Sequence, residues 1–165
     1  MSETLQGGQY LTFIVKDEIF ALSVMEIKEI IEYSEITRVP MMQKFVKGVT
    51  NVRGSVIPII DLSLRFGMDA NIPSAKTSIV IVETIIDGDT TEVGLIIDAV
   101  NQVHQITEID NRQSPDFGAK IRKDFIEKII MIDGKFVIVL KLDTLLSLEE
   151  LGRIENKKDL GVFNA

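Results

Sequence analysis

The apolar residues of this chain fall in short β-rich runs separated by polar turns. Residues 10–15 (YLTFIV) and 19–24 (IFALSV) flank a polar turn and predict a first β-hairpin. The apolar positions of residues 25–33 fit either a helix or a strand, and so short a run leaves both open. A second hairpin is predicted over about 46–62, and the LSLRFG that closes it predicts a short helix ending at Gly67.

The same order of apolar runs restarts in the second half of the chain. Residues 77–84 (TSIVIVET) and 92–100 (EVGLIIDAV) predict a hairpin around an Asp-Gly turn. A last hairpin is predicted over 125–142. Ser147 and Glu150 then form a capping-box pattern, which predicts a short C-terminal helix.

The two halves form an internal repeat. Residues 45–62 align without a gap on residues 125–142, so that aliphatic and Phe positions meet aliphatic and Phe positions, and Gly54 falls on Gly134. A weaker match places residues 20–30 on residues 93–103. Each half therefore predicts a hairpin, a single segment and a second hairpin.

A mainly β fold of two packed five-stranded modules follows from this repeat. Sheets of so few strands usually close into barrels that cover their edges. The repeat places the first module at 1–72, the second at 73–146, and the C-terminal helix and tail at 147–165. The pattern leaves strands free to cross between the modules.

The repeat also isolates one residue that turn chemistry does not explain. The second copy has Asp133-Gly134, the pair favoured in tight turns where both central residues have positive φ. The first copy has Asn51-Val52-Arg53-Gly54, and arginine is not favoured there. Asn51, Gly54 and Gly134 are expected to shape the turns, whereas Arg53 is either a tolerated surface residue or one retained for recognition.

Composition and charge narrow the class of protein. Of the 165 residues, 45% are hydrophobic, cysteine is absent and the net charge is −7, which disfavours general nucleic-acid binding. Residues 36–60 nevertheless carry four bases and no acid, which suggests an interaction surface. Neither a signal peptide nor a membrane-spanning run is evident, so a soluble cytosolic protein is expected.

Motifs for catalysis are missing from the sequence. It has no glycine-rich nucleotide loop and no serine elbow, and its single histidine, His104, has no companion with which to build a zinc site. Four acids follow predicted strands, where acids commonly cap or face water: Asp61, Asp98, Asp110 and Asp143. We therefore expect no enzyme activity, no catalytic residues, no cofactor and no metal.

The segment FVKGVTNVRGSVIPIIDLSLRFG resembles the hallmark segment of the CheW chemotaxis coupling proteins. Val52 stands where leucine is commoner, and the resemblance extends over about 9–151. It implies two SH3-like five-stranded β-barrels and a non-catalytic adaptor. Such an adaptor bridges the cytoplasmic tips of transmembrane chemoreceptors and the regulatory domain of the chemotaxis histidine kinase, and so controls kinase autophosphorylation.

The same resemblance implies the sites and the location. Receptor-binding residues would be Ile27, Glu29, Arg53 and Val103, with Glu29 orienting Arg53, and kinase-binding residues would be Ile36 and Gly48. The protein would be cytoplasmic, without membrane insertion, recruited through its partners to receptor arrays and able to form rings with kinase regulatory domains. The alternative is a generic small-barrel module that binds peptides or nucleic acid; an enzyme is the third reading.

Overall fold

The computed structural model describes residues 8–86, 88–106 and 121–147. Within these ranges the chain forms ten strands, two short α-helices and two 3-10 turns. The strands are β1 (Gly8–Val15), β2 (Glu18–Ser23), β3 (Ile27–Glu32), β4 (Val46–Val52), β5 (Ser55–Asp61), β6 (Ser78–Ile86), β7 (Asp89–Ile97), β8 (Ala99–Ile106), β9 (Ile126–Ile132) and β10 (Lys135–Leu140). The helices are α2 (Leu62–Arg65) and α3 (Leu142–Leu145), and the 3-10 turns are η1 (Val24–Glu26) and η2 (Lys123–Phe125).

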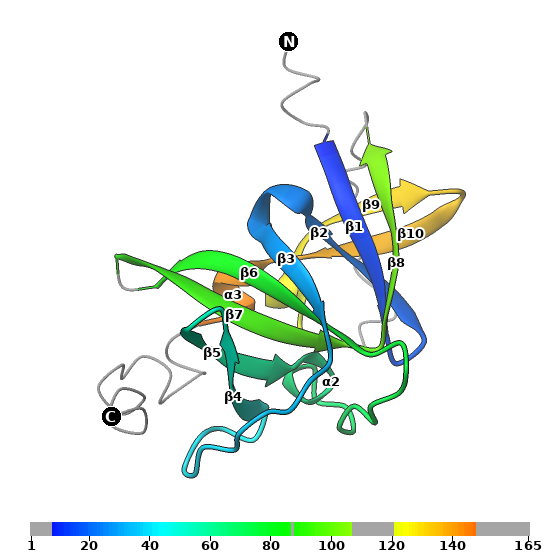
Figure 1. Cartoon of the computed structure of the whole chain (residues 1–165). Helices are drawn as coiled ribbons and strands as arrows, with labels where there is room; N and C mark the ends of the chain where they lie inside the picture. The colour runs from blue at the N-terminus through cyan, green and yellow to red at the C-terminus, as the bar shows by residue number, and fades with distance from the viewer. Residues whose placement is uncertain (1–7, 87, 107–120, 148–165) are drawn as a thin grey trace.

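The strands form two five-stranded sheets. Sheet A has the order β8-β1-β2-β10-β9, and sheet B has the order β3-β6-β7-β5-β4. Figure 1 shows sheet A at the upper right and sheet B at the lower left. The predicted mainly β fold of two five-stranded units is confirmed. The helix predicted after Ser147 lies outside the described residues.

The sheets do not follow the division of the chain at residue 72. β1 and β2 join β8, β9 and β10 from the second half, whereas β3, β4 and β5 join β6 and β7. Each sheet is completed by one parallel pair, in which Ile138 lies opposite Phe20 and Ile60 lies opposite Leu95. Strands therefore cross between the two sequence modules, and neither half of the chain completes a sheet alone.

The sequence repeat has a structural counterpart. β4, β5 and α2 correspond in the alignment to β9, β10 and α3, and both pairs of strands are antiparallel hairpins joined by a two-residue turn. Each sheet also has a β-bulge at the matching position, where Lys28 of β3 and Asn101 of β8 have no partner in the strand register. The two sheets are thus related position by position.

Residues 25–33, for which the sequence allowed either a helix or a strand, form mainly a strand. The segment contains the end of η1 and then β3, which pairs antiparallel with β6. Its apolar residues alternate in burial along β3, and Ile31 packs against the apolar cluster of sheet B. The short helix α2 ends as predicted, because Phe66 is the C-cap and Gly67 follows with a φ of +86°.

The hydrophobic core has three parts. The largest cluster joins the two sheets and contains a chain of aromatic rings, in which the Phe20 and Phe66 centroids lie 5.0 Å apart and the Phe66 and Phe125 centroids 6.2 Å apart. Smaller clusters lie against sheet A and sheet B, and each contains residues of one sheet and its connections. Burial of side chains from both sheets in one cluster fixes the two sheets together.

Candidate recognition site at the Arg53 turn

The turn between β4 and β5 presents Arg53 on the surface. Arg53 has a φ of +51° and Gly54 a φ of +86°, the combination that a type I′ turn requires. The Asn51 side chain closes the turn, since its Oδ1 accepts a hydrogen bond from the Gly54 amide at 2.9 Å. Left-handed backbone is unfavourable for an arginine, so local propensity does not account for the residue.

Arg53 is held by Glu29 of β3. Its Nη1 donates to Glu29 Oε2 at 2.5 Å, and the two side chains are 75% and 19% exposed respectively. This hydrogen bond, followed by the negative charge of Glu29, raises the pKa of Arg53 above its ordinary value. Glu29 is the only side-chain partner of Arg53 in the described part of the chain, so the remaining donors of the guanidinium face solvent.

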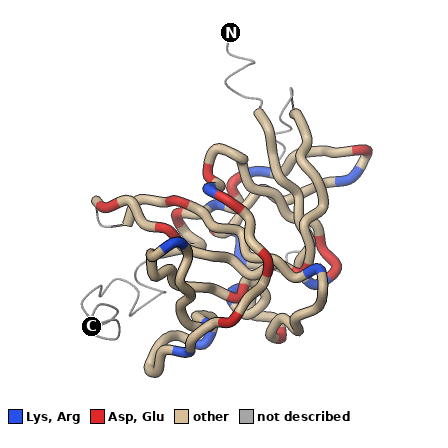
Figure 2. Tube along the Cα trace, viewed as in Figure 1, with Lys and Arg blue, Asp and Glu red and all other residues tan. Residues whose placement is uncertain are grey.

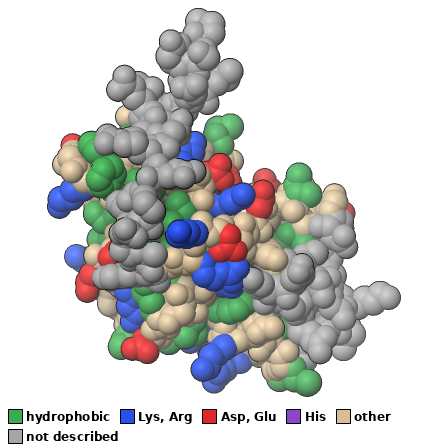
Figure 3. Space-filling model, turned by 180° about the vertical axis from the view of Figure 1, so that it is seen from behind, with side chains coloured by type: hydrophobic (Ala, Val, Ile, Leu, Met, Phe, Trp, Pro, Cys, Tyr) green, Lys and Arg blue, Asp and Glu red, His purple; other side chains and the backbone are tan. Residues whose placement is uncertain are grey.

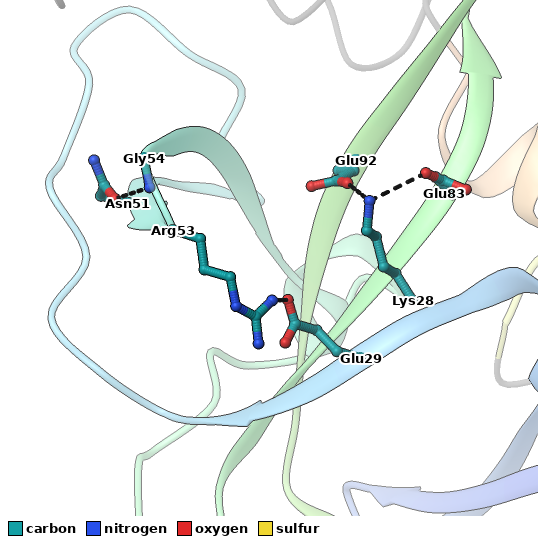
Figure 4. A network of polar contacts seen from close by, with 7 residues as sticks. All are labelled: Lys28, Glu29, Asn51, Arg53, Gly54, Glu83 and Glu92. Carbon is teal, nitrogen blue, oxygen red and sulfur yellow. Dashed lines mark hydrogen bonds and ion pairs between the residues drawn. The ribbon is translucent and has the colours of Figure 1, made fainter.

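A second ion-pair group lies beside this contact. Lys28, next to Glu29 on β3, contacts Glu83 of β6 at 3.4 Å and also contacts Glu92 of β7. The hydrogen bond to Glu92 is the main reason that the pKa of Lys28 is raised. Figure 4 shows Lys28 pointing toward the two glutamates, whereas Glu29 points toward Arg53. The surface around Arg53 is therefore a network of two cations and three carboxylates.

Charged side chains also occur on other parts of the described surface (Figure 2 and Figure 3). Figure 2 shows acidic residues along the β6–β7 hairpin that projects to the left. Figure 3, seen from behind, shows basic, acidic and hydrophobic side chains interspersed over the described part of that face. The Arg53 turn differs because a cation is displayed at the tip of a hairpin and is oriented by a half-buried carboxylate.

Ile36 and Gly48 are brought together, next to the same edge of sheet B. The backbone of Thr37 exchanges two hydrogen bonds of 2.8 Å with Val49 of β4. Gly48 is buried with a φ of +149°, and a Cβ on it would lie 2.0 Å from the Thr37 carbonyl oxygen. Ile36 is half-buried and packs against the apolar cluster of sheet B. Both residues therefore have a packing role that is independent of any partner.

Ile27 and Val103 occupy different surroundings. Ile27 begins β3 and packs partly buried against the main core, in the same strand as Glu29. Val103 lies on β8, at the edge of sheet A, and is 52% exposed. Glu29 and Arg53 are in direct contact, Ile27 is two residues from Glu29, and Val103 belongs to the other sheet.

Arg65 is a structural residue that the sequence pattern did not single out. It is 8% exposed in α2, and its Nε donates to the Leu145 carbonyl of α3 at 2.8 Å. Its guanidinium carbon lies 4.7 Å from the ring centroids of both Phe45 and Phe125. Arg65 thus connects the two related helices through the core. The only sequence signal for it is a basic residue at the C-terminal end of a short helix.

Two of the four acids at strand ends, Asp61 and Asp98, are structural, whereas Asp143 is exposed and Asp110 lies outside the described residues. Asp61 is fully buried, caps α2 through the Ser63 amide, and accepts a second hydrogen bond from the Asn71 amide. Asp98 accepts from the Lys16 amide at 2.8 Å and contacts the Asn71 side chain. Among the described residues, no group of three or more His, Asp or Glu side chains could hold a metal ion. No described helix has the length and apolar character needed to span a membrane.

The chain is a β protein of two five-stranded sheets that match position by position. Its candidate site is the hairpin turn that displays Arg53, whose side chain is oriented by the Glu29 carboxylate, and this turn is a candidate surface for recognition. Residues 9–150 match the family model for the CheW-like domain, and the chain belongs to that family. The resemblance drawn from the FVKGVTNVRGSVIPIIDLSLRFG segment is therefore confirmed.

Individual relatives cover nearly the whole chain. The chemotaxis protein CheW of Rhizobium meliloti is 30% identical over 144 residues, which cover 87% of this chain and 90% of the relative. The chemotaxis protein CheW of Thermotoga maritima is 32% identical over 149 residues, or 88% of this chain and 92% of the relative. The crystal structure of the scaffolding protein TtCheW from Thermoanaerobacter tengcongensis matches with a TM-score of 0.74 at 32% identity, covering 87% of this chain and 95% of that one.

Proposed function

We propose that this chain is a non-catalytic adaptor that couples transmembrane chemoreceptors to the chemotaxis histidine kinase and thereby controls kinase autophosphorylation. Its membership of the CheW-like family and its likeness to a protein described as a scaffold support this function. The observation that carries the proposal is the Arg53 turn, where an arginine is displayed on a backbone that disfavours it. The protein acts in the cytoplasm and reaches receptor arrays through its partners.

In this proposal Arg53 is the polar anchor for the receptor tip. A guanidinium has five donors in a rigid fork, and Glu29 engages one nitrogen, so a carboxylate or carbonyl of the partner can take the others. Glu29 limits the directions in which the fork can point, which lowers the entropy lost on binding. Ile27 and Val103 supply apolar contact, of which Val103 is the more exposed.

The kinase contact is proposed near Ile36 and Gly48. Because both residues are packed inward, the contact would use the backbone and the exposed side chains of the segment that lies on β4 rather than these two side chains alone. Alternation with kinase regulatory domains in a ring is part of the same proposal. The three carboxylates close to Arg53 disfavour the alternative of nucleic-acid binding, since phosphates would be repelled there.

The test is co-elution of the chain with a kinase regulatory domain and a receptor cytoplasmic fragment. Wild type should form a ternary species, and Arg53→Asn should lose the receptor fragment while keeping its fold. Lys76→Asn is the matched control, because it removes one positive charge from an exposed residue away from the turn. Absence of a ternary species for wild type, or equal loss in the two variants, would refute the proposal.

A further inference from the structure

The site that corresponds to the Arg53–Glu29 contact is open in sheet A. Asp133 occupies the turn position of Arg53 in the repeat, with the same φ of +51°. Gln102 follows the β8 bulge as Glu29 follows the β3 bulge. In sheet B the side chains of Arg53 and Glu29 form an ion pair, whereas in sheet A the corresponding side chains of Asp133 and Gln102 line a cavity.

This cavity is large enough for a guest side chain. Its volume is about 190 Å³, the share of roughly six water molecules in the liquid. Ile19, Ile132 and Val137 give it aliphatic walls, contributed by β2, β9 and β10. The polar lining comes from β1, β8, the turn between β9 and β10, and Lys135 at the start of β10. An aliphatic wall with a polar rim suits a guest that has an apolar stem and a polar head.

The polar rim offers three acceptor groups beside the ammonium of Lys135. The side-chain nitrogen Nδ2 of Asn101 donates to Thr12 Oγ1 at 3.0 Å, and the side-chain nitrogen Nε2 of Gln102 contacts His104 Nδ1 at 3.4 Å. The side-chain oxygens of Asn101 and Gln102 have no hydrogen bond with the described residues, and neither does the Asp133 carboxylate. These acceptors suit a cation with several N–H donors, whose binding the charge of Lys135 would oppose.

We propose that this cavity binds the arginine side chain of a partner polypeptide. The methylene stem packs on the aliphatic walls, and the guanidinium donates to the Asp133 carboxylate and to the oxygen of Gln102. The incoming guanidinium thus supplies to sheet A the cation that Arg53 supplies within sheet B. The site lies on the other sheet from the Arg53 turn, so its test does not depend on Arg53, although Val103 of the proposed receptor contact is next to Gln102 on β8.

Lys135 gives the proposal a sharp test. It lines the same cavity, is exposed, and makes no ion pair with the described residues through its side chain. Its positive charge opposes an incoming guanidinium but would attract a carboxylate. Neutralising Lys135 should therefore strengthen binding of an arginine, whereas it would weaken binding of an acidic side chain.

The experiment uses the full chain labelled with ¹⁵N and titrated with N-acetyl-arginine methylamide. We expect shifts of the Asn101 and Gln102 side-chain amide signals that saturate in the millimolar range. The same titration with the matched citrulline amide, which has the shape of arginine without its charge, should give clearly weaker binding. Asp133→Asn should weaken arginine binding by about two- to fivefold, as for an exposed ion pair, and Lys135→Gln should strengthen it.

Each result decides the proposal. Lys76→Asn, at an exposed residue outside the cavity, should bind the blocked arginine as wild type does, which excludes a general effect of charge. Equal binding of the citrulline compound, unchanged binding in Asp133→Asn, or weaker binding in Lys135→Gln would each overturn it. Binding of free L-arginine without binding of the blocked amide would also overturn it, because the cavity would then serve an amino acid and not a polypeptide.

Discussion

Arg53 and Asp133 share a backbone φ of +51° at the same position of two related hairpins. Aspartate is common in such a turn and arginine is not, because a short polar side chain tolerates left-handed backbone. The identical backbone therefore shows that Arg53 occupies a turn built for another residue type. The Glu29 contact is one interaction that this side chain makes, and contact with an external partner is the one that we propose.

Arg53→Asn should separate folding from recognition. Asparagine suits left-handed backbone better than arginine does, so the unfolding midpoint should stay unchanged or rise slightly. Binding of the receptor fragment should weaken by more than about tenfold, as for loss of an arginine at the centre of an interface. Thermal unfolding and a binding titration on the same sample check both results. A clear fall in the midpoint would assign Arg53 to the fold instead.

Glu29 should act on binding through Arg53. Glu29→Gln leaves the guanidinium without its orienting carboxylate, so it should weaken receptor binding in wild type but have little effect once Arg53 is replaced. A double-mutant cycle with Glu29→Gln and Arg53→Asn measures this coupling. Glu32→Gln, on an exposed position of the same strand, is the matched control. Losses that simply add would show that the contact does not serve recognition.

Gly48→Ala should unfold the edge of sheet B. The added Cβ would meet the Thr37 carbonyl oxygen at 2.0 Å, and the φ of +149° is one that alanine rarely adopts. Strain and overpacking together should lower the free energy of unfolding by about 3 kcal/mol. Chemical denaturation checks this value.

Gly54→Ala provides the comparison for Gly48. Its Cβ would enter open space, so only the positive φ of +86° opposes it, and the loss should be about 1 kcal/mol. Equal losses at the two positions would contradict the packing role of Gly48. The comparison also bears on the proposed kinase contact. Weaker kinase binding in a Gly48 variant would follow from local unfolding, so it would not by itself show that Gly48 contacts the kinase.

Local features of the fold were predictable because local chemistry determines them. Alternating apolar runs and turn residues marked the hairpins, and the aligned repeat marked ten strands in two groups. The pairing of the strands was not predictable from these patterns. β1 pairs with β8 and β3 with β6, over long separations, through backbone hydrogen bonds that any apolar strand could make.

Parts of the candidate site were hidden for similar reasons. The Glu29–Arg53 contact followed from the family resemblance together with the anomaly in the turn, and the structure contains it. The tight approach of Thr37 to Gly48 depends on a segment crossing to the far edge of the sheet, which no local pattern records. The cavity near Asp133 needs residues from five strands and one turn, so only the assembled sheet defines it.

Arg65→Met should destabilise the junction of the two sheets. Methionine keeps much of the apolar stem but leaves the Leu145 and Thr144 carbonyls without the guanidinium that now donates to them. Loss of hydrogen bonds from a charged, buried donor should lower the free energy of unfolding by about 2–4 kcal/mol. Arg38→Met, at an exposed position, should change it by less than about 0.5 kcal/mol. Similar values for the two variants would show that Arg65 has no role in holding α2 against α3.

Glu26 should make the protein less stable as pH rises above the acidic range. Burial raises the pKa of Glu26 above its ordinary value of 4.5, and the charges of Glu127 and Asp143 raise it further, partly offset by Lys128. The folded protein therefore binds a proton more tightly than the unfolded chain, so stability is greatest below pH 4.5 for this group and falls as pH rises through the raised pKa.

Glu26→Gln should remove that dependence, because the neutral amide carries no charge to desolvate. Its free energy of unfolding should exceed that of wild type at pH 7 and approach it well below pH 4.5, where Glu26 is protonated in both states of the wild-type chain. Urea denaturation of the two proteins across this range checks the difference. Parallel curves would mean that the carboxylate of Glu26 is already well solvated in the folded protein, and that the nearby charges of Glu127 and Asp143 impose no cost.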